Sequence, residues 1–132
     1  MTVENLKDIW DAERGFKPSN EIRRVVIPDA LVDTGATTLA LPTRFINQLG
    51  LKQTSEKRAT SANGKTQNKV YEAVRITLLD RNCTVDVIEV PDDVPALIGQ
   101  IPLVMLDLVI DLQGRRLTGN PAHGGEQTLE LY

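Results

Sequence analysis

Two neighbouring stretches of the chain, residues 70–78 and 83–87, repeat apolar residues with a period of two. The apolar positions are Val70, Val74, Ile76 and Leu78 in the first stretch, and Cys83, Val85 and Val87 in the second. This period is typical of strands that bury one face. Asp80, Arg81 and Asn82 lie between them and have the chemistry of a turn. The pattern therefore predicts an antiparallel hairpin, and the chain has to fold around a sheet.

A second hairpin is predicted just before the first. Residues 52–69 form the most polar block of the chain, with Asn63 and Gly64 near its centre. Both residues tolerate the positive φ angles of a tight hairpin turn, so the block is interpreted as a protruding polar hairpin. A solvated surface loop remains the alternative.

The remaining elements are short. We predict strands at residues 3–9, 22–27, 97–98, 108–111, 115–118 and 128–132, and helices at residues 42–49 and 100–106. Pro102 is compatible with the second helix because it lies in the first turn. Many short strands, two short helices and no internal repeat predict a mainly β fold closed into a small barrel.

Composition narrows the possible functions. The chain has 132 residues, 41% hydrophobic and 25% charged, which predicts a single globular domain over residues 1–132. A net charge of −3 and only 4% aromatic residues argue against a nucleic-acid partner. Cys83 is the only cysteine, so an internal disulfide is excluded and a reducing compartment is favoured. We expect Cys83 to be a small buried hydrophobe.

The chain shows no targeting signal. Its first residues lack a basic start followed by an apolar core, and no apolar run approaches the ~18 residues needed to span a bilayer. A soluble, cytoplasmic protein without a membrane partner is expected.

The motif that carries chemistry is Asp33-Thr34-Gly35-Ala36, which directly follows the apolar run at residues 30–32. By typical residue frequencies, Asp-Thr-Gly before a small residue occurs by chance in about one chain of this length in a few hundred. Taken alone, Asp33 is best interpreted as a residue that opens a turn and accepts backbone N–H bonds.

The motif is followed by two further features in a fixed order. A small-Asn-Gly sequence, Ala62-Asn63-Gly64, marks the tip of the polar hairpin, and Leu97-Ile98-Gly99 directly precedes a predicted helix. With this ordered set, residues 22–117 resemble the retroviral-type aspartic proteases, the retropepsin family and its cellular or prokaryotic relatives. The resemblance implies a small acid-protease-type barrel with a flap hairpin.

The resemblance also implies roles for the matched residues. Asp33 would be the catalytic carboxylate. Thr34 would brace the active-site loop, Gly35 would let the backbone approach the substrate, and Ala36 would complete the loop. The flap over bound peptide would contain Ala62, Asn63 and Gly64. Packing beneath the catalytic loop would come from Leu97, Ile98 and Gly99.

Two positions depart from the family pattern. Gln100 follows Gly99 where retroviral members usually carry an arginine, which puts their interface salt bridge in doubt. Pro28-Asp29 interrupts the strand that leads into the motif.

The family chemistry sets a further requirement. Peptide hydrolysis by this route uses two carboxyls that share one proton, because like charges about 3 Å apart cannot both ionise cheaply. The chain contains no second Asp-Thr-Gly or Asp-Ser-Gly. An enzyme of this kind therefore has to be a homodimer in which each subunit supplies Asp33. Residues 3–9 and 128–132 are candidates for the dimer sheet, and no cofactor or metal is expected.

Two other candidate sites are less well supported than the Asp33 motif. His123 lies in a Gly-rich tail without a serine or cysteine nucleophile, so a solvated loop residue is favoured over a triad base. Asp92-Asp93 could bind a cation but is more typical of a surface turn.

Two functions remain open. The first is a homodimeric aspartic endopeptidase that cleaves peptide or protein substrates and favours apolar side chains. The second is a non-catalytic peptide-binding or dimerisation module on the same fold, because a fold does not establish activity.

Overall fold

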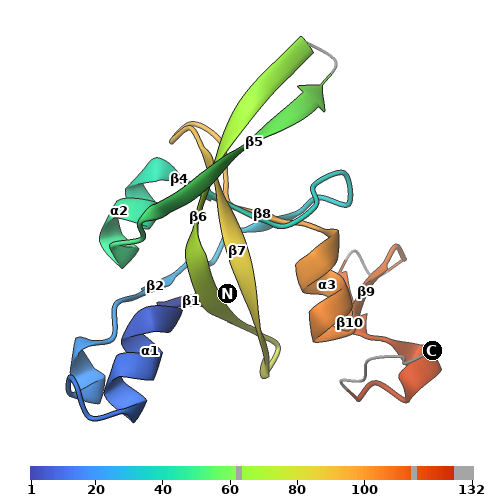
Figure 1. The fold of residues 1–132 in the computed structure, drawn as a ribbon. Helices are drawn as coiled ribbons and strands as arrows, with labels where there is room; N and C mark the ends of the chain where they lie inside the picture. Colours follow the sequence, from blue (N-terminus) through green and yellow to red (C-terminus); the bar gives the residue numbers. More distant parts are fainter. Residues whose placement is uncertain (62–63, 114–115, 127–132) are drawn as a thin grey trace, which may run out of the picture.

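A curled, mainly antiparallel sheet forms the body of the protein in this computed structural model (Figure 1). The structure describes residues 1–61, 64–113 and 116–126, and of residues 57–67 it describes no side chains. Along the main sheet the strands are β2 (Arg24–Val26), β1 (Thr2–Asn5), β6 (Gly64–Leu78), β7 (Arg81–Val90), β4 (Leu39–Pro42), β8 (Leu97–Ile98) and β3 (Leu31–Val32). A further strand, β5 (Gln53–Ser61), pairs with β6 outside this path. The mainly β prediction is confirmed.

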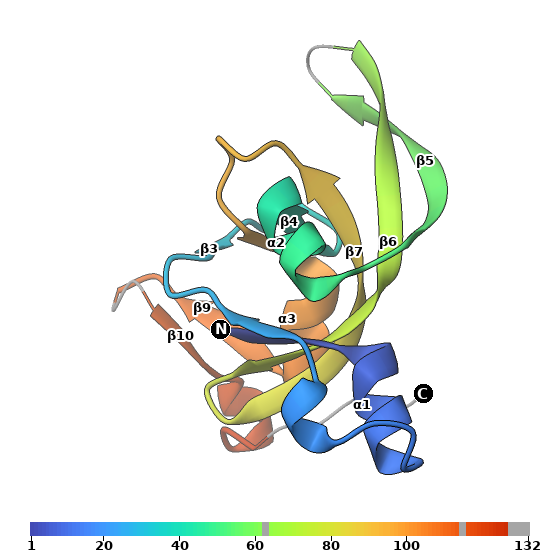
Figure 2. The ribbon, with the colours of Figure 1, turned by 90° about the vertical axis from the view of Figure 1, so that its left-hand side faces the viewer.

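The sheet curls into a half-barrel around one apolar core (Figures 1 and 2). Leu39, Ile76 and Val87 of the sheet are fully buried in this core, together with Leu106 from outside the sheet. In the described residues the path of paired strands begins at β2 and ends at β3, so closure into a barrel is not confirmed.

The long β6–β7 hairpin lies in the middle of the sheet and confirms the first sequence prediction. Its register pairs Ile76 with Cys83, and Leu78 with Arg81. The turn consists of Leu79 and Asp80, which have φ angles of 51° and 62°, one residue earlier than predicted. Positive φ at both central residues gives a two-residue turn whose twist matches the flanking strands.

One irregularity bends β6. Between Tyr71 and Val74 the register gains one residue on β6 relative to β7, which is a β-bulge. Glu72, the position at which the apolar alternation of the sequence fails, lies within this bulge. The bulge allows β6 to leave the body of the sheet and continue into the β5–β6 hairpin.

The polar block forms the predicted hairpin rather than a loop. Strands β5 and β6 pair from Gln53 to Ser61 and project beyond the body of the molecule (Figure 1). Ser61 pairs with Gly64, while Ala62 and Asn63 lie outside the described residues.

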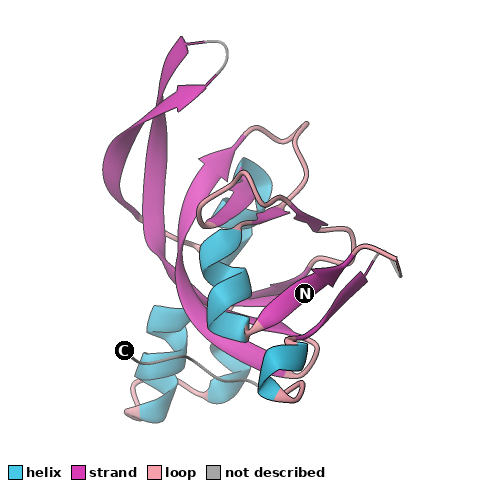
Figure 3. Ribbon diagram, turned by 90° about the vertical axis from the view of Figure 1, so that its right-hand side faces the viewer, coloured by secondary structure: helices cyan, strands magenta, loops and turns pink. Residues whose placement is uncertain are grey.

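The N-terminal prediction was wrong. Residues 3–9 were expected to form a strand, but β1 ends at Asn5 and helix α1 (Leu6–Glu13) follows (Figure 3). The side-chain Oδ1 of Asn5 accepts the Asp8 N–H at 3.0 Å and caps the helix. Leu6 and Ile9, three residues apart, are buried on one helix face. The described chain thus has three α-helices, where two were predicted.

The other two helices lie close to their predicted bounds. Helix α2 spans Thr43–Leu49 and ends at Gly50, whose φ of 64° suits the left-handed cap. Helix α3 spans Gln100–Leu106, as predicted. Two 3₁₀ turns, Ser19–Glu21 and Pro121–His123, complete the helical segments that the structure describes.

Strand β1 has partners on both sides. Val3 pairs with Val25 of β2 on one side and with Ile76 of β6 on the other. The expectation that residues 3–9 supply a dimer strand was therefore wrong, because this strand is already internal to the sheet. Residues 128–132, the other candidate, lie outside the described residues.

A separate two-stranded sheet follows α3. Strands β9 (Leu108–Asp111) and β10 (Arg116–Gly119) pair antiparallel, with Ile110 opposite Leu117. The hairpin predicted in this region is confirmed.

Asp8 ties α1 to the segment that leads into β2. Its side chain is only 1% exposed, and its oxygens accept hydrogen bonds from the Arg23 side chain, the Arg23 backbone N–H and Lys17 Nζ, at 2.8 to 3.0 Å. The bonds from the Arg23 side chain, aided by Lys17, hold the pKa of Asp8 well below its usual range, although burial opposes this shift.

We expect Asp8→Asn to lower the free energy of unfolding at pH 7 by about 2 kcal/mol, because bonds to a buried carboxylate are lost. The folded pKa of Asp8 lies below its unfolded value of about 3.9. Its stabilisation is therefore present above about pH 4 and is lost as the pH falls through the folded value. The difference between variant and wild type should accordingly shrink on acidification.

Urea denaturation at pH 7 and at pH 3 measures this difference. Glu4→Gln is the control, since Glu4 pairs with Arg24, which is 54% exposed, and such a pair contributes less than about 1 kcal/mol. A loss for Asp8→Asn no larger than that of Glu4→Gln, or a loss that grows in acid, would contradict the prediction.

Candidate active site

Asp33 leaves the sheet at a position fixed by two short parallel strands. Leu31 and Val32 of β3 pair with Leu97 and Ile98 of β8. The Asp33 N–H continues this ladder by donating to the Ile98 carbonyl oxygen at 3.0 Å. The sheet thereby determines where the following loop begins.

The loop itself is a tight turn. The Ala36 N–H donates to the Asp33 carbonyl oxygen at 3.0 Å, and the Gly35 N–H donates to Asp33 Oδ1 at 2.9 Å. Asp33 therefore opens a turn in the way that its residue type favours. Its side chain is partly exposed, and Thr34 and Gly35 are exposed. One carboxylate oxygen is oriented by the turn, while the other makes no hydrogen bond to the part of the chain that the structure describes.

Gly99 packs directly beneath this loop. A Cβ at Gly99 would lie 2.5 Å from the Thr38 carbonyl oxygen and 2.6 Å from that of Ala36. Such distances are far below van der Waals contact, so only glycine allows the two backbone segments to approach this closely. The Gly99 N–H uses the approach to donate to the Thr38 carbonyl oxygen at 3.1 Å.

The first residues of α3 hold the rest of the loop. The Gln100 N–H donates to the Ala36 carbonyl oxygen at 2.9 Å, and the Ile101 N–H donates to that of Thr37 at 2.8 Å. The Gln100 side chain adds a bond from Nε2 to the Thr34 carbonyl oxygen at 2.6 Å. The N-terminus of a helix has free N–H groups, and here they support the loop that carries Asp33.

Sequence reasoning missed this use of Gln100. The residue was noted only for departing from the usual arginine, although a long amide at the start of a helix directly after Gly99 was a usable signal. The bond from the Gln100 side chain to Thr34 lies within one chain, so it stabilises the loop without a second subunit.

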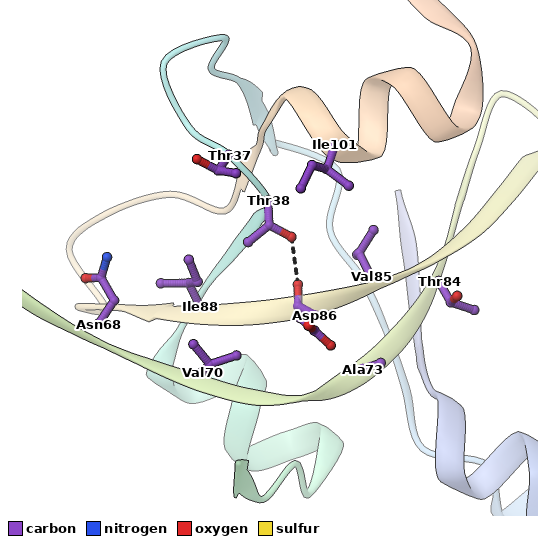
Figure 4. A pocket seen from close by; sticks show the side chains of 10 residues that line it. All are labelled: Thr37, Thr38, Asn68, Val70, Ala73, Thr84, Val85, Asp86, Ile88 and Ile101. Carbon is purple, nitrogen blue, oxygen red and sulfur yellow. Dashed lines mark hydrogen bonds between the residues drawn. The ribbon is translucent and has the colours of Figure 1, made fainter. Parts of the chain in front are cut away.

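A pocket of about 530 Å³ begins beside the loop (Figure 4). Its lining consists of Thr37, Thr38, Asn68, Val70, Ala73, Thr84, Val85, Asp86, Ile88 and Ile101. Asp33 does not line the pocket, but Thr37 and Thr38 follow it by four and five residues. Thr38 Oγ1 donates to the Asp86 carbonyl oxygen at 3.0 Å, which joins the loop to β7. Valine and isoleucine side chains on several sides suit the pocket to an apolar group.

The described contacts do not bring the hairpin tip to Asp33. Gly64 lies at the start of β6, and the two residues before it are outside the described part. The position of Ala62, Asn63 and Gly64 over the site stays a prediction.

His123 is not the solvated residue that was expected. Its side chain is 15% exposed, and Nδ1 lies 2.7 Å from Oδ2 of Asp107. Asp107 caps the end of α3 with a left-handed backbone and is itself buried. The pair connects the last described turn of the chain to α3.

Cys83 and Asp92 have structural roles. Cys83 is buried, as predicted, and burial raises the pKa of its thiol to about 11, so the reactive thiolate is scarce at neutral pH. Asp92 accepts the Arg44 N–H at 2.9 Å in a surface turn. In the part of the chain that the structure describes, no group of three or more His, Cys, Asp or Glu side chains could hold a metal ion.

Comparison with known proteins identifies the family. The sequence model described as aspartyl protease matches residues 22–101, more than half of the chain, and this range contains the Asp33 loop and the Gly99 segment. The chain belongs to the retropepsin-like aspartyl proteases.

Comparison with individual proteins gives a match to a solved structure. The solution structure of a simian foamy virus protease matches with 22% sequence identity and a TM-score of 0.44, over 56% of this chain and 77% of the viral one. No curated protein matches the sequence. Among the described residues, no helix has the length and apolar character needed to cross a membrane.

Proposed function

We propose that the chain is a homodimeric aspartic endopeptidase whose site is built from two copies of Asp33, one per subunit. The proposal rests above all on one observation. A partly exposed carboxylate stands on a loop that is held from below by β8 and by the start of α3. A loop fixed by so many backbone bonds is suited to positioning a reacting group.

The chemistry then follows the family route. One of the paired carboxyls is ionised and takes a proton from a water molecule as the water oxygen attacks the peptide carbonyl carbon. The other carboxyl is protonated and donates its proton to the carbonyl oxygen, which gives a tetrahedral diol. When the C–N bond breaks, the first carboxyl, now protonated, donates its proton to the leaving nitrogen, and the second, now ionised, takes a proton from a hydroxyl of the diol, so both carboxyls regain their starting state.

The Gly35 N–H has a defined part in this scheme. It holds Oδ1 of Asp33 from within the same loop at 2.9 Å, which sets the direction of the carboxyl plane. Two carboxyls have to meet at about 3 Å to share a proton, so the orientation of each one matters.

The substrate is proposed to be an extended peptide with apolar side chains. The pocket beside Thr37 and Thr38 can take such a side chain, with Ile88 and Ile101 as apolar contacts. The projecting β5–β6 hairpin would serve as the flap, with Ala62, Asn63 and Gly64 nearest to the bound peptide. We propose a single domain over residues 1–132 that acts in the cytoplasm without a metal or cofactor.

The alternative is a non-catalytic peptide-binding or dimerisation module. A module of that kind needs the pocket and the paired subunits but has no need of Asp33. The oriented carboxylate and the support beneath it favour the enzyme.

Cleavage of a peptide library between pH 4 and pH 7.5 tests the proposal, with Asp33→Asn as the inactive control. Below the dissociation constant of the dimer, the cleavage rate should rise with the square of the protein concentration, because active sites form in proportion to dimers. A wild-type dimer that cleaves nothing over this range would support the binding module instead.

Gln100→Ala tests the support of the loop. Loss of the bond to the Thr34 carbonyl oxygen should lower kcat/KM about fivefold, which corresponds to about 1 kcal/mol, because the loop is held less firmly. Steady-state kinetics measure this loss. Gln48→Ala, an exposed position on α2, is the matched control. Equal activities of the two variants would show that the bond does not contribute to positioning.

A further inference from the structure

The proposed function leaves open which kind of side chain the pocket beside the Asp33 loop selects. Thr84, Asp86 and Ile88 line this pocket, and they alternate along β7 with buried residues such as Cys83 and Val87. They therefore stand on the outer face of the strand. The core lies on the other face, so this one is open to a ligand.

The walls of the pocket are mainly apolar, but they include one charged group. Val70, Ile88 and Ile101 supply apolar surface from β6, β7 and α3 (Figure 4). Asp86 is the one charged residue among the described residues that line the pocket, and it is exposed. A ligand that combines an apolar stem with a polar end fits such a lining.

The Asp86 carboxylate has no partner within the described part of the chain. Thr38 Oγ1 donates to the backbone carbonyl oxygen of Asp86 and not to its side chain. Arg75, whose Cα pairs with that of Thr84, does not line the pocket and forms no ion pair with Asp86. The carboxylate is therefore available to a group that a ligand brings.

The charge of this carboxylate limits which side chains the pocket can accept at little cost. A purely apolar side chain that fills the pocket removes water from the carboxylate and does not replace its hydrogen bonds. An acidic side chain adds repulsion between like charges. A lysine or arginine lays its methylene groups along the apolar walls and places a cation at the carboxylate.

We infer that Asp86 determines specificity: the pocket binds a lysine or arginine of the peptide, at a position other than the two that flank the cleaved bond. The inference rests on the proposed function, which supplies the peptide and its place beside the loop. The position follows from Asp33, which does not line the pocket, whereas Thr37 and Thr38 do. The stem of the basic residue makes the apolar contacts there, and residues next to the cleaved bond keep their apolar preference.

A matched pair of peptides tests this inference. In a peptide that wild type cleaves, each position is replaced in turn by lysine and by norleucine, which has the same stem without the charge. At one position wild type should favour lysine by about tenfold in kcat/KM, because a bond between charged groups satisfies the carboxylate. Asp86→Asn should abolish this preference, and Asp86→Lys should favour glutamate at the same position.

Asp29→Asn is the control variant, since Asp29 is an exposed carboxylate that does not line the pocket. It should keep the preference for lysine, and thermal unfolding midpoints close to that of wild type show that all the variants fold. A lysine preference that Asp86→Asn leaves intact overturns the inference. Equal cleavage of the lysine and norleucine peptides at every position also overturns it.

Binding measured without cleavage separates this inference from the proposed function. Fluorescence anisotropy compares lysine and norleucine peptides, selected from a library by binding, on the Asp33→Asn protein with and without Asp86→Asn. A lysine preference that depends on Asp86, in a chain whose wild type cleaves nothing, supports the inference and overturns the enzyme proposal. Cleavage without that preference does the reverse. A wild-type chain that neither binds nor cleaves any peptide of the library overturns both.

Discussion

Asp33→Asn is expected to lower kcat/KM for peptide cleavage by at least about 10⁴-fold. An asparagine pair can neither accept a proton from water as a carboxylate does nor donate one as a carboxylic acid does, so both proton transfers are lost. The fold should be retained, because an amide oxygen can still accept the Gly35 N–H. Steady-state kinetics at several concentrations measure the loss, and a thermal unfolding midpoint close to that of wild type shows that it is chemical.

Asp29→Asn is the matched control, since Asp29 is an exposed carboxylate four residues earlier. Mixing gives a stronger test. In an equal mixture of wild type and Asp33→Asn that associates at random, about one dimer in four has two Asp33 residues. Activity at fixed total protein should fall to about a quarter of the wild-type value. A fall to one half would show that each subunit acts alone and would contradict the shared site.

Gly99→Ala is expected to destabilise the protein by about 2 to 3 kcal/mol and to lower kcat/KM about 100-fold. The added methyl group would meet two carbonyl oxygens at 2.5 and 2.6 Å, and these backbone atoms cannot rotate away. The loop after β3 has to move, and a displacement of about 1 Å at a catalytic group can cost a factor of about 10². The φ of Gly99 is −89°, so backbone strain does not contribute.

Gly15→Ala separates packing from backbone effects. Gly15 has a φ of 78° and nothing within 4 Å of an added Cβ, so its substitution costs about 1 kcal/mol through the backbone alone. Its activity should match wild type. Urea denaturation and kinetics on both variants give the comparison. Wild-type activity in Gly99→Ala would mean that the loop does not depend on this close approach.

Local sequence signals correctly predicted the end or start of a helix where a single residue determines it. Gly50 ends α2 because a left-handed cap suits glycine, and α3 begins at Gln100, directly after Gly99. Helix α1 was not predicted, because two local signals conflicted. Leu6 and Ile9 have helical spacing and Asn5 is a good capping residue, but Val3 extended the apolar pattern and favoured a strand.

Contacts between segments far apart in the chain could not be predicted from the sequence. The motif predicted that Asp33 stands on a loop, and it does. The bonds from Gln100 and Gly99 to that loop depend on packing between segments more than 60 residues apart, which no local pattern encodes. The same holds for β1, whose two partners lie in different halves of the chain and occupy both of its edges.

The pairing of β3 with β8 also has a consequence for the order in which the site can form. Residues 31–32 are synthesised early, but their partners at residues 97–98 emerge only after the whole β5–β6 hairpin and β7. Such distant contacts are made late, because loop closure opposes them. Until they form, the Asp33 turn has neither the ladder nor the helix start beneath it. Under the proposed function, a nascent or partly unfolded chain would thus be unable to cut neighbouring polypeptides, and cleavage would begin only after folding is complete.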